Sequence, residues 1–114
     1  MSDAYLAHLH DLLDPLGAVT TRAMFGGHGV YLDGALIGVV MGEALYLKVD
    51  DETRLLFEAA GCEPYVYLGQ AEPITMSYWS LPDAAMDSAE AMRPWAELAR
   101  AAASRASRKP KRDR

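Results

Sequence analysis

The sequence predicts an α+β fold of two layers, in which an antiparallel sheet of about five strands carries helices on one face. Two turns support the sheet: Asp33-Gly34 separates two apolar runs, as in a tight β-hairpin, and Gly42-Glu43 follows the second run. Apolar residues at helical spacing near both ends of the chain support the helices. The predicted order is one helix, three strands, a helix, two strands and a final helix.

The first helix is predicted from an apolar stripe at helical spacing, which consists of Tyr5, Leu6, Leu9, Leu12, Leu13 and Leu16. Ser2 or Asp3 is its expected cap, and Pro15 and Gly17 are expected to end it. Residues 19–25 are then predicted as a short strand or an extended arm.

Three strands are predicted for residues 29–33, 35–41 and 45–49. The middle strand is apolar on both of its faces, which favours a place near the centre of the sheet. The third strand alternates, because Tyr46 and Lys48 share one face and three apolar residues share the other.

A second helix is predicted after residue 50. Asp50 or Asp51 is its expected cap, and Gly61 is expected to end it. Its helical stripe consists of Leu55, Leu56, Ala59 and Ala60. Alternating residues at 65–68 and 74–81 then predict a second hairpin.

The last helix is predicted to end near residue 106, with a capping box formed by Asp87 and Glu90. Pro94 lies inside this helix, which predicts a kink or a break just before it, since proline removes one helical hydrogen bond. Residues 107–114 have no apolar side chain and are predicted to be disordered. We therefore expect one domain over residues 1–106 and a basic tail over 107–114.

The charges of the chain are distributed unevenly. Residues 1–104 hold five Lys/Arg against fifteen Asp/Glu, whereas residues 105–114 hold six against one. No apolar run reaches the roughly 20 residues that a membrane span needs, and the start of the chain lacks the features of a signal peptide. Cys62 is the only cysteine, so no disulfide can form within the chain. We expect a cytoplasmic protein without a membrane segment.

Five motifs taken together carry a family resemblance: RAMFGG from Arg22, GVYLDG from Gly29, LYLKVDDETR from Leu45, LFEAAG from Leu56 and PITMSYW from Pro73. They resemble the N-terminal domain of the TfoX/Sxy family of bacterial competence regulators, over most of the chain. The resemblance implies a small α+β domain and a role in competence or transcription regulation. It supplies no catalytic residues. Many members carry a second, helical domain, and this chain stops before one.

The residues themselves do not predict an enzyme, a metal site or a cofactor. The glycine cluster at 26–29 leads into a strand and lacks the Lys-Ser/Thr of a phosphate loop. His8 and His10 lie two apart, which places them on different faces of a helix. Cys62 has no cationic neighbour that would activate it and is interpreted as a small core residue.

The main candidate site is an aromatic face of the sheet, formed by Tyr31, Tyr46, Lys48, Tyr65, Tyr67 and one of Tyr78 or Trp79. One interpretation is an interface, which would bind a second copy of the chain or a protein partner such as a transcription regulator or the transcription machinery. The other is that the rings pack among themselves. Arg22 either contacts an anion or pairs with an acid such as Glu58.

The alternative function is association with nucleic acid through the basic tail, whose cations are Arg105, Arg108, Lys109, Lys111, Arg112 and Arg114. The tail could equally be a solvated terminus. A pocket for a small ligand between the sheet and the helices is a third alternative. The first hypothesis is a regulatory module that acts through protein contacts.

Overall fold

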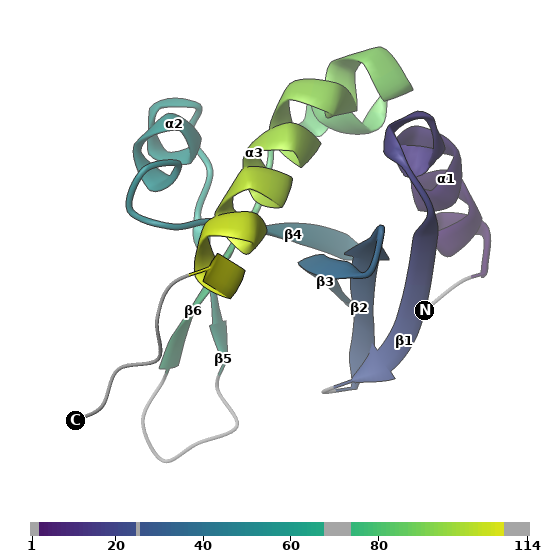
Figure 1. Ribbon diagram of the computed structural model, residues 1–114, viewed down its shortest axis with the longest axis horizontal. Helices are drawn as coiled ribbons and strands as arrows, with labels where there is room; N and C mark the ends of the chain where they lie inside the picture. The colour runs from purple at the N-terminus through teal and green to yellow at the C-terminus, as the bar shows by residue number, and fades with distance from the viewer. Residues whose placement is uncertain (1–2, 25, 68–73, 109–114) are drawn as a thin grey trace.

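The computed structural model describes residues 3–24, 26–67 and 74–108 (Figure 1). Its helical elements are α1 (Asp3–Leu13), α2 (Arg54–Ala59), α3 (Ala89–Arg108) and the 3-10 turns η1 (Asp14–Leu16) and η2 (Asp83–Met86). Its strands are β1 (Val19–Met24), β2 (Gly27–Leu32), β3 (Ala35–Met41), β4 (Ala44–Lys48), β5 (Pro64–Tyr67) and β6 (Ile74–Trp79). The predicted α+β class is confirmed.

The strands form one antiparallel sheet of six in the order β1-β2-β3-β4-β6-β5. This is one strand more than the predicted set, because β1 pairs with β2 along its whole length, from Val19 opposite Leu32 to Met24 opposite Gly27. Both φ angles of the Asp33-Gly34 turn are positive, at 52° and 86°, as a type I′ hairpin requires. The predicted hairpin is confirmed.

The sheet opens at one end between β3 and β4. Ile37 is an extra residue in the pairing of β3 with β2, and β3 pairs with β4 only from Gly38 onward. At the same end Lys48 pairs instead with Tyr78 of β6. The bulge therefore lets the start of β3 diverge from the end of β4, since an extra residue bends its strand.

The hydrophobic core lies between the sheet and the helices α1 and α3. In Figure 1, α3 crosses the strands and α1 lies beside β1. The buried helical residues include Leu9, Leu13, Met92, Ala96 and Ala99, and the strands contribute Val30, Val40, Leu45 and Leu47. The alanines of α3 are small, which lets this helix pack closely against the sheet.

The start of α3 differs from the prediction. Ser88, not Asp87, caps the helix, because its Oγ accepts a hydrogen bond from the N–H of Ala91 at 3.0 Å. Of the kink or break predicted before Pro94, the break is wrong, since α3 continues through Pro94. The physical reason is that Pro94 lies near the helix start and is exposed, so the carbonyl that loses its helical donor can be satisfied by water. The helix also continues to Arg108, past its predicted end, whereas 109–114 lie outside the described residues.

Candidate interaction surfaces

The side of the sheet that faces away from the core carries most of the predicted aromatic face. Residues opposite each other in an antiparallel pair point to the same side, and the pairs here are Tyr31 with Leu36, Val39 with Tyr46, and Lys48 with Tyr78. We use the name tyrosine face for Arg22, Tyr31, Tyr46, Lys48, Tyr65 and Tyr78.

Trp79 is not part of the tyrosine face. It pairs with Leu47, and it is 8% exposed within the core under the helices. Of the two alternatives at this strand, Tyr78 is therefore the one that lies on the outer side. The side chain of Tyr67 lies outside the described part of the structure.

Two cations on the tyrosine face rest on aromatic rings. The guanidinium carbon of Arg22 lies 5.8 Å from the centre of the Tyr31 ring, and Lys48 Nζ lies 5.3 Å from that of Tyr78. Neither cation forms an ion pair with an acid of the described residues. The predicted pairing of Arg22 with Glu58 is wrong, because α2 places Glu58 beside Arg54 instead.

The rings of Tyr31, Tyr46, Tyr65 and Tyr78 on the tyrosine face are half-buried. Tyr46 and Tyr65 contact each other with their ring centres 5.0 Å apart. Burial raises the pKa of Tyr78, and the Tyr31 hydroxyl raises it further. Beneath the rings, Val39 is only 3% exposed although it lies outside the core cluster of the helical side.

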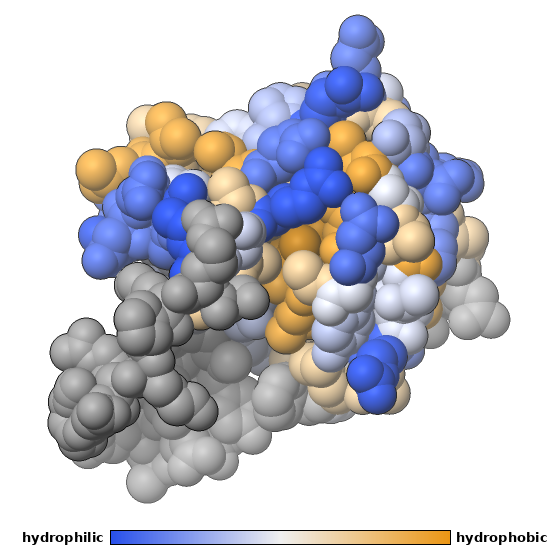
Figure 2. Space-filling view, viewed as in Figure 1, coloured by the Kyte–Doolittle hydropathy of each residue, from blue (hydrophilic) through white to orange (hydrophobic). Residues whose placement is uncertain are grey.

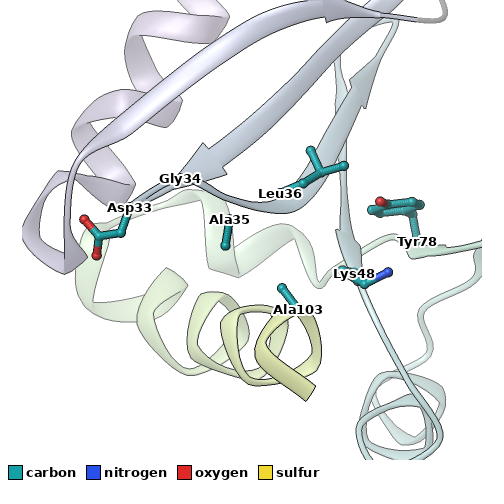
Figure 3. A pocket seen from close by; sticks show the side chains of 7 residues that line it. All are labelled: Asp33, Gly34, Ala35, Leu36, Lys48, Tyr78 and Ala103. Carbon is teal, nitrogen blue, oxygen red and sulfur yellow. The ribbon is translucent and has the colours of Figure 1, made fainter. Parts of the chain in front are cut away.

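A cavity of about 440 Å³ occupies the open end of the sheet (Figure 3). Leu36, Lys48 and Tyr78 line one side of it, and Ala103 of α3 and the Asp33-Gly34 turn line the other. The cavity thus connects the tyrosine face with the last turns of α3.

The second exposed surface lies on α2, where the predicted helical stripe faces solvent. Leu55 is 62% exposed and Leu56 is 52% exposed, and Ala59 and Ala60 are exposed beside them. An apolar patch is visible at the position of α2 in Figure 2. We use the name leucine surface for these four residues. The helix is held to the body by Phe57, which is fully buried and meets the ring of Trp95 at 5.0 Å, edge to face.

Acidic side chains border the leucine surface. The side chain of Asp51 is 95% exposed, and Arg54 lies between it and Glu58, with N–O distances of 3.0 and 3.9 Å. Glu52 is also exposed at the start of the helix. The rim of the surface therefore carries more negative than positive charge.

Asp50 anchors the turn that leads into α2. Its carboxylate accepts the backbone N–H groups of Glu52 and Thr53, both at 3.1 Å. The prediction that Asp50 or Asp51 is the N-cap is wrong, because α2 begins at Arg54 and its cap position is Thr53. Arg105 of α3 donates to the same carboxylate at 2.6 and 3.1 Å. This hydrogen bond lowers the pKa of Asp50 to about 2. Arg105, which was assigned to the tail, thus fastens α3 to the start of α2.

The histidine and cysteine side chains considered in the sequence lie in ordinary structural settings. His8 contacts the carbonyl of Met86 at 2.8 Å. Burial raises the pKa of the free Cys62 thiol, which disfavours the reactive thiolate. Across the described ranges, no three His, Cys, Asp or Glu side chains come close enough together to hold a metal ion. In the same part of the chain, no helix is both long and apolar enough to cross a membrane.

The exposure of the leucine surface was missed by the sequence analysis, although a signal for it exists. Leu55, Leu56 and Phe57 are consecutive apolar residues on a helix of six. Successive helical residues point about 100° apart, so three in a row cannot share one face. The largest of them occupies the core side and leaves the leucines outside.

Comparison with known proteins agrees with the resemblance in the motifs. The family model of the TfoX N-terminal domain matches residues 11–103. The "DNA transformation protein TfoX1" of Aliivibrio fischeri (strain ATCC 700601 / ES114) is 27% identical over 82 residues, which cover 68% of this chain and 39% of the relative. The chain thus spans about two fifths of that relative's length. The family match covers most of the chain, which therefore belongs to the TfoX N-terminal domain family.

Proposed function

We propose that this chain is a non-catalytic regulatory module of the cytoplasm that acts by binding another protein through its leucine surface. The observation that carries the proposal is the exposure of Leu55 and Leu56, the large hydrophobic side chains that the described structure leaves exposed. Adjacent exposed leucines on a surface helix are typical of a protein contact, because burying exposed apolar groups against a partner is favourable in free energy.

The rim of the surface indicates the chemistry of the partner. Asp51 and Glu58 share the single cation of Arg54, and Glu52 shares Arg105 with Asp50. The acids thus outnumber their cations, and they would attract Lys or Arg residues on either side of an apolar segment. A second copy of the same surface would instead bring these acids toward one another, and like charges at an interface are unfavourable. We therefore infer a partner that presents apolar residues flanked by basic ones.

The proposed pathway is the control of competence, through transcription. The name of the Aliivibrio relative connects that protein with DNA transformation. We extend this connection to the present chain on the basis of the shared domain, with a transcription regulator or a part of the transcription machinery as the partner.

A site-specific photocrosslinker tests the surface. Placed at position 56, it should form a defined adduct with a protein in cells of the source organism, since the leucine surface is buried in the complex. The control places the same group at Ala7, which is exposed on α1. An absence of adducts at position 56, or the same adducts at both positions, would contradict the proposal.

A double variant tests the regulatory role. Leu55→Ser with Leu56→Ser should abolish the adduct formed by a crosslinker at Ala60 and change transcript levels in the same direction as deletion of the gene. The matched variant Ala4→Ser with Ala7→Ser changes exposed residues of α1 and should do neither. A double leucine variant that remains folded and leaves the transcripts as in the wild type would exclude a regulatory role for this surface.

A further inference from the structure

We propose that the tyrosine face binds single-stranded nucleic acid, with bases stacking on its rings and phosphates meeting Arg22 and Lys48. This site is separate from the leucine surface and adds a second class of ligand to the proposed protein partner. The proposal rests on two features of the face: its charge and the arrangement of its rings and cations.

The charge of the face differs from that of the rest of the molecule. None of its described residues is acidic, although residues 1–104 carry ten more acids than bases. Asp33, Glu43 and Glu63 each stand next to the end of a strand in the sequence, and Asp50 follows β4 by two residues. Asp33 is moreover engaged by Arg100 at 3.4 Å and by the N–H of Ala18 at 2.9 Å.

The two cations of the face are free to meet an anion. Arg54, Arg100 and Arg105 each form ion pairs in the described structure, whereas Arg22 and Lys48 have only aromatic partners. Lys48 does line a second cavity together with Asp50, Asp51 and Glu52. These acids already have cationic partners, because Arg105 pairs with Asp50 and Glu52, and Arg54 pairs with Asp51.

Rings and cations alternate on the face in a way that suits a nucleic acid strand. Tyr46 and Lys48 lie two residues apart on β4, and Arg22 of the edge strand β1 lies over the ring of Tyr31 on β2. Tyr78 of β6 lies opposite Lys48, whose Nζ is 5.3 Å from the centre of its ring. Single strands bind to such surfaces because each base has a flat face for stacking and each phosphate a charge for the cations. An acidic peptide would use the cations but not the rings.

The last turns of α3 lie beside the same face. Ala103 lines the cavity at the open end of the sheet together with Lys48 and Tyr78. A second copy of the face would set Arg22 and Lys48 against like charges, since none of the described strand residues of the face is acidic.

Fluorescence anisotropy tests the proposal with a labelled oligothymidylate. Its length of about twelve nucleotides lies within the range that small single-strand sites cover. The full chain should bind it at low salt. Tyr46→Leu should weaken binding roughly tenfold, the effect of losing one stacked base, whereas Tyr46→Phe, which keeps the ring, should bind as the wild type does. Lys48→Met should make the plot of log binding constant against log salt concentration shallower by about 0.7, the slope that one phosphate contact of a single strand contributes.

The controls separate the face from general charge effects. Arg93→Met removes an exposed cation of α3 and should change neither affinity nor slope. A duplex of the same length that binds equally well would overturn the proposal, because paired bases cannot stack on the rings. So would binding that is lost on removing residues 109–114 but unchanged in Tyr46→Leu and Lys48→Met. Self-association of the free protein that Tyr46→Leu abolishes would show that the face is a dimer interface instead.

Discussion

The leucine surface and the tyrosine face are both exposed, but the molecule supports them in different ways. The leucine surface lies on a helix of six residues. This helix is attached to the body by one buried ring, Phe57, and by Arg105, which pairs with Asp50 and Glu52 at the start of the helix. The tyrosine face is part of the sheet itself, and its rings lie over paired strands and over Val39. The first surface has few attachments and the second has many.

This difference has consequences for how each surface responds to change. A surface with two attachments can be detached without unfolding the domain, since short segments open locally at a low free-energy cost. A surface built on the middle strands of a sheet is lost only when the sheet is disrupted. We therefore expect substitutions below the leucine surface to act locally, and substitutions below the tyrosine face to act on the whole fold.

Phe57→Ala is the variant with the largest expected effect. Phe57 is fully buried and packs against Trp95, and the loss of such a ring costs about 3–5 kcal/mol of the free energy of unfolding. Urea denaturation measures this loss. Hydrogen exchange should also show reduced protection of residues 54–61 with little change in β2 and β3. Uniform loss of protection over the domain would show that α2 is not a separately attached element.

Val39→Ala tests the other side of the comparison. Val39 is 3% exposed and lies under the tyrosine face, so removing two methyl groups should cost about 2 kcal/mol. The reduction in hydrogen-exchange protection should extend over β2, β3 and β4, because these strands are paired with one another. The control Ala23→Gly alters an exposed residue of the edge strand β1, and should cost less than Val39→Ala. If Val39→Ala lowered the free energy of unfolding no more than Ala23→Gly does, the packing of Val39 under the tyrosine face would contribute little to stability.

Much of the fold could be predicted because its signals are local. The Asp33-Gly34 turn, the alternation of Tyr46 and Lys48 and the glycine at 61 each depend on a few neighbouring residues. The edge strand β1 was left open between a strand and an extended arm, because Val19–Met24 is polar at its centre and becomes a strand by pairing with β2. Its assignment depends on a partner, which a local pattern does not show.

The candidate sites were harder to predict, since they depend on contacts between distant residues. Arg105 reads as part of a basic tail, yet α3 continues far enough to bring it to Asp50. Tyr78 and Trp79 are neighbours in the sequence, and only the pairing with Lys48 and Leu47 decides which one faces outward. In both cases the missing information was the register of one element against another.

The smallest of the three effects concerns the second attachment of α2, the ion pair of Asp50 with Arg105. The pKa of Asp50 is about 2 in the folded protein against an ordinary 3.8, so the charged carboxylate favours the folded state. A lowered pKa gives a contribution to stability that is present above pH 3.8 and is lost as the pH falls from 3.8 toward 2.

Asp50→Asn keeps an acceptor for the backbone N–H groups but removes the charge. The difference in urea midpoint between the wild type and this variant should therefore shrink as the pH falls from 3.8 toward 2. The control Asp11→Asn changes an exposed acid of α1, and its urea midpoint should differ less from that of the wild type at every pH. A difference for Asp50→Asn that stays constant from pH 6 to pH 2 would mean that the ion pair does not hold α2, and Phe57 alone would then remain as its anchor.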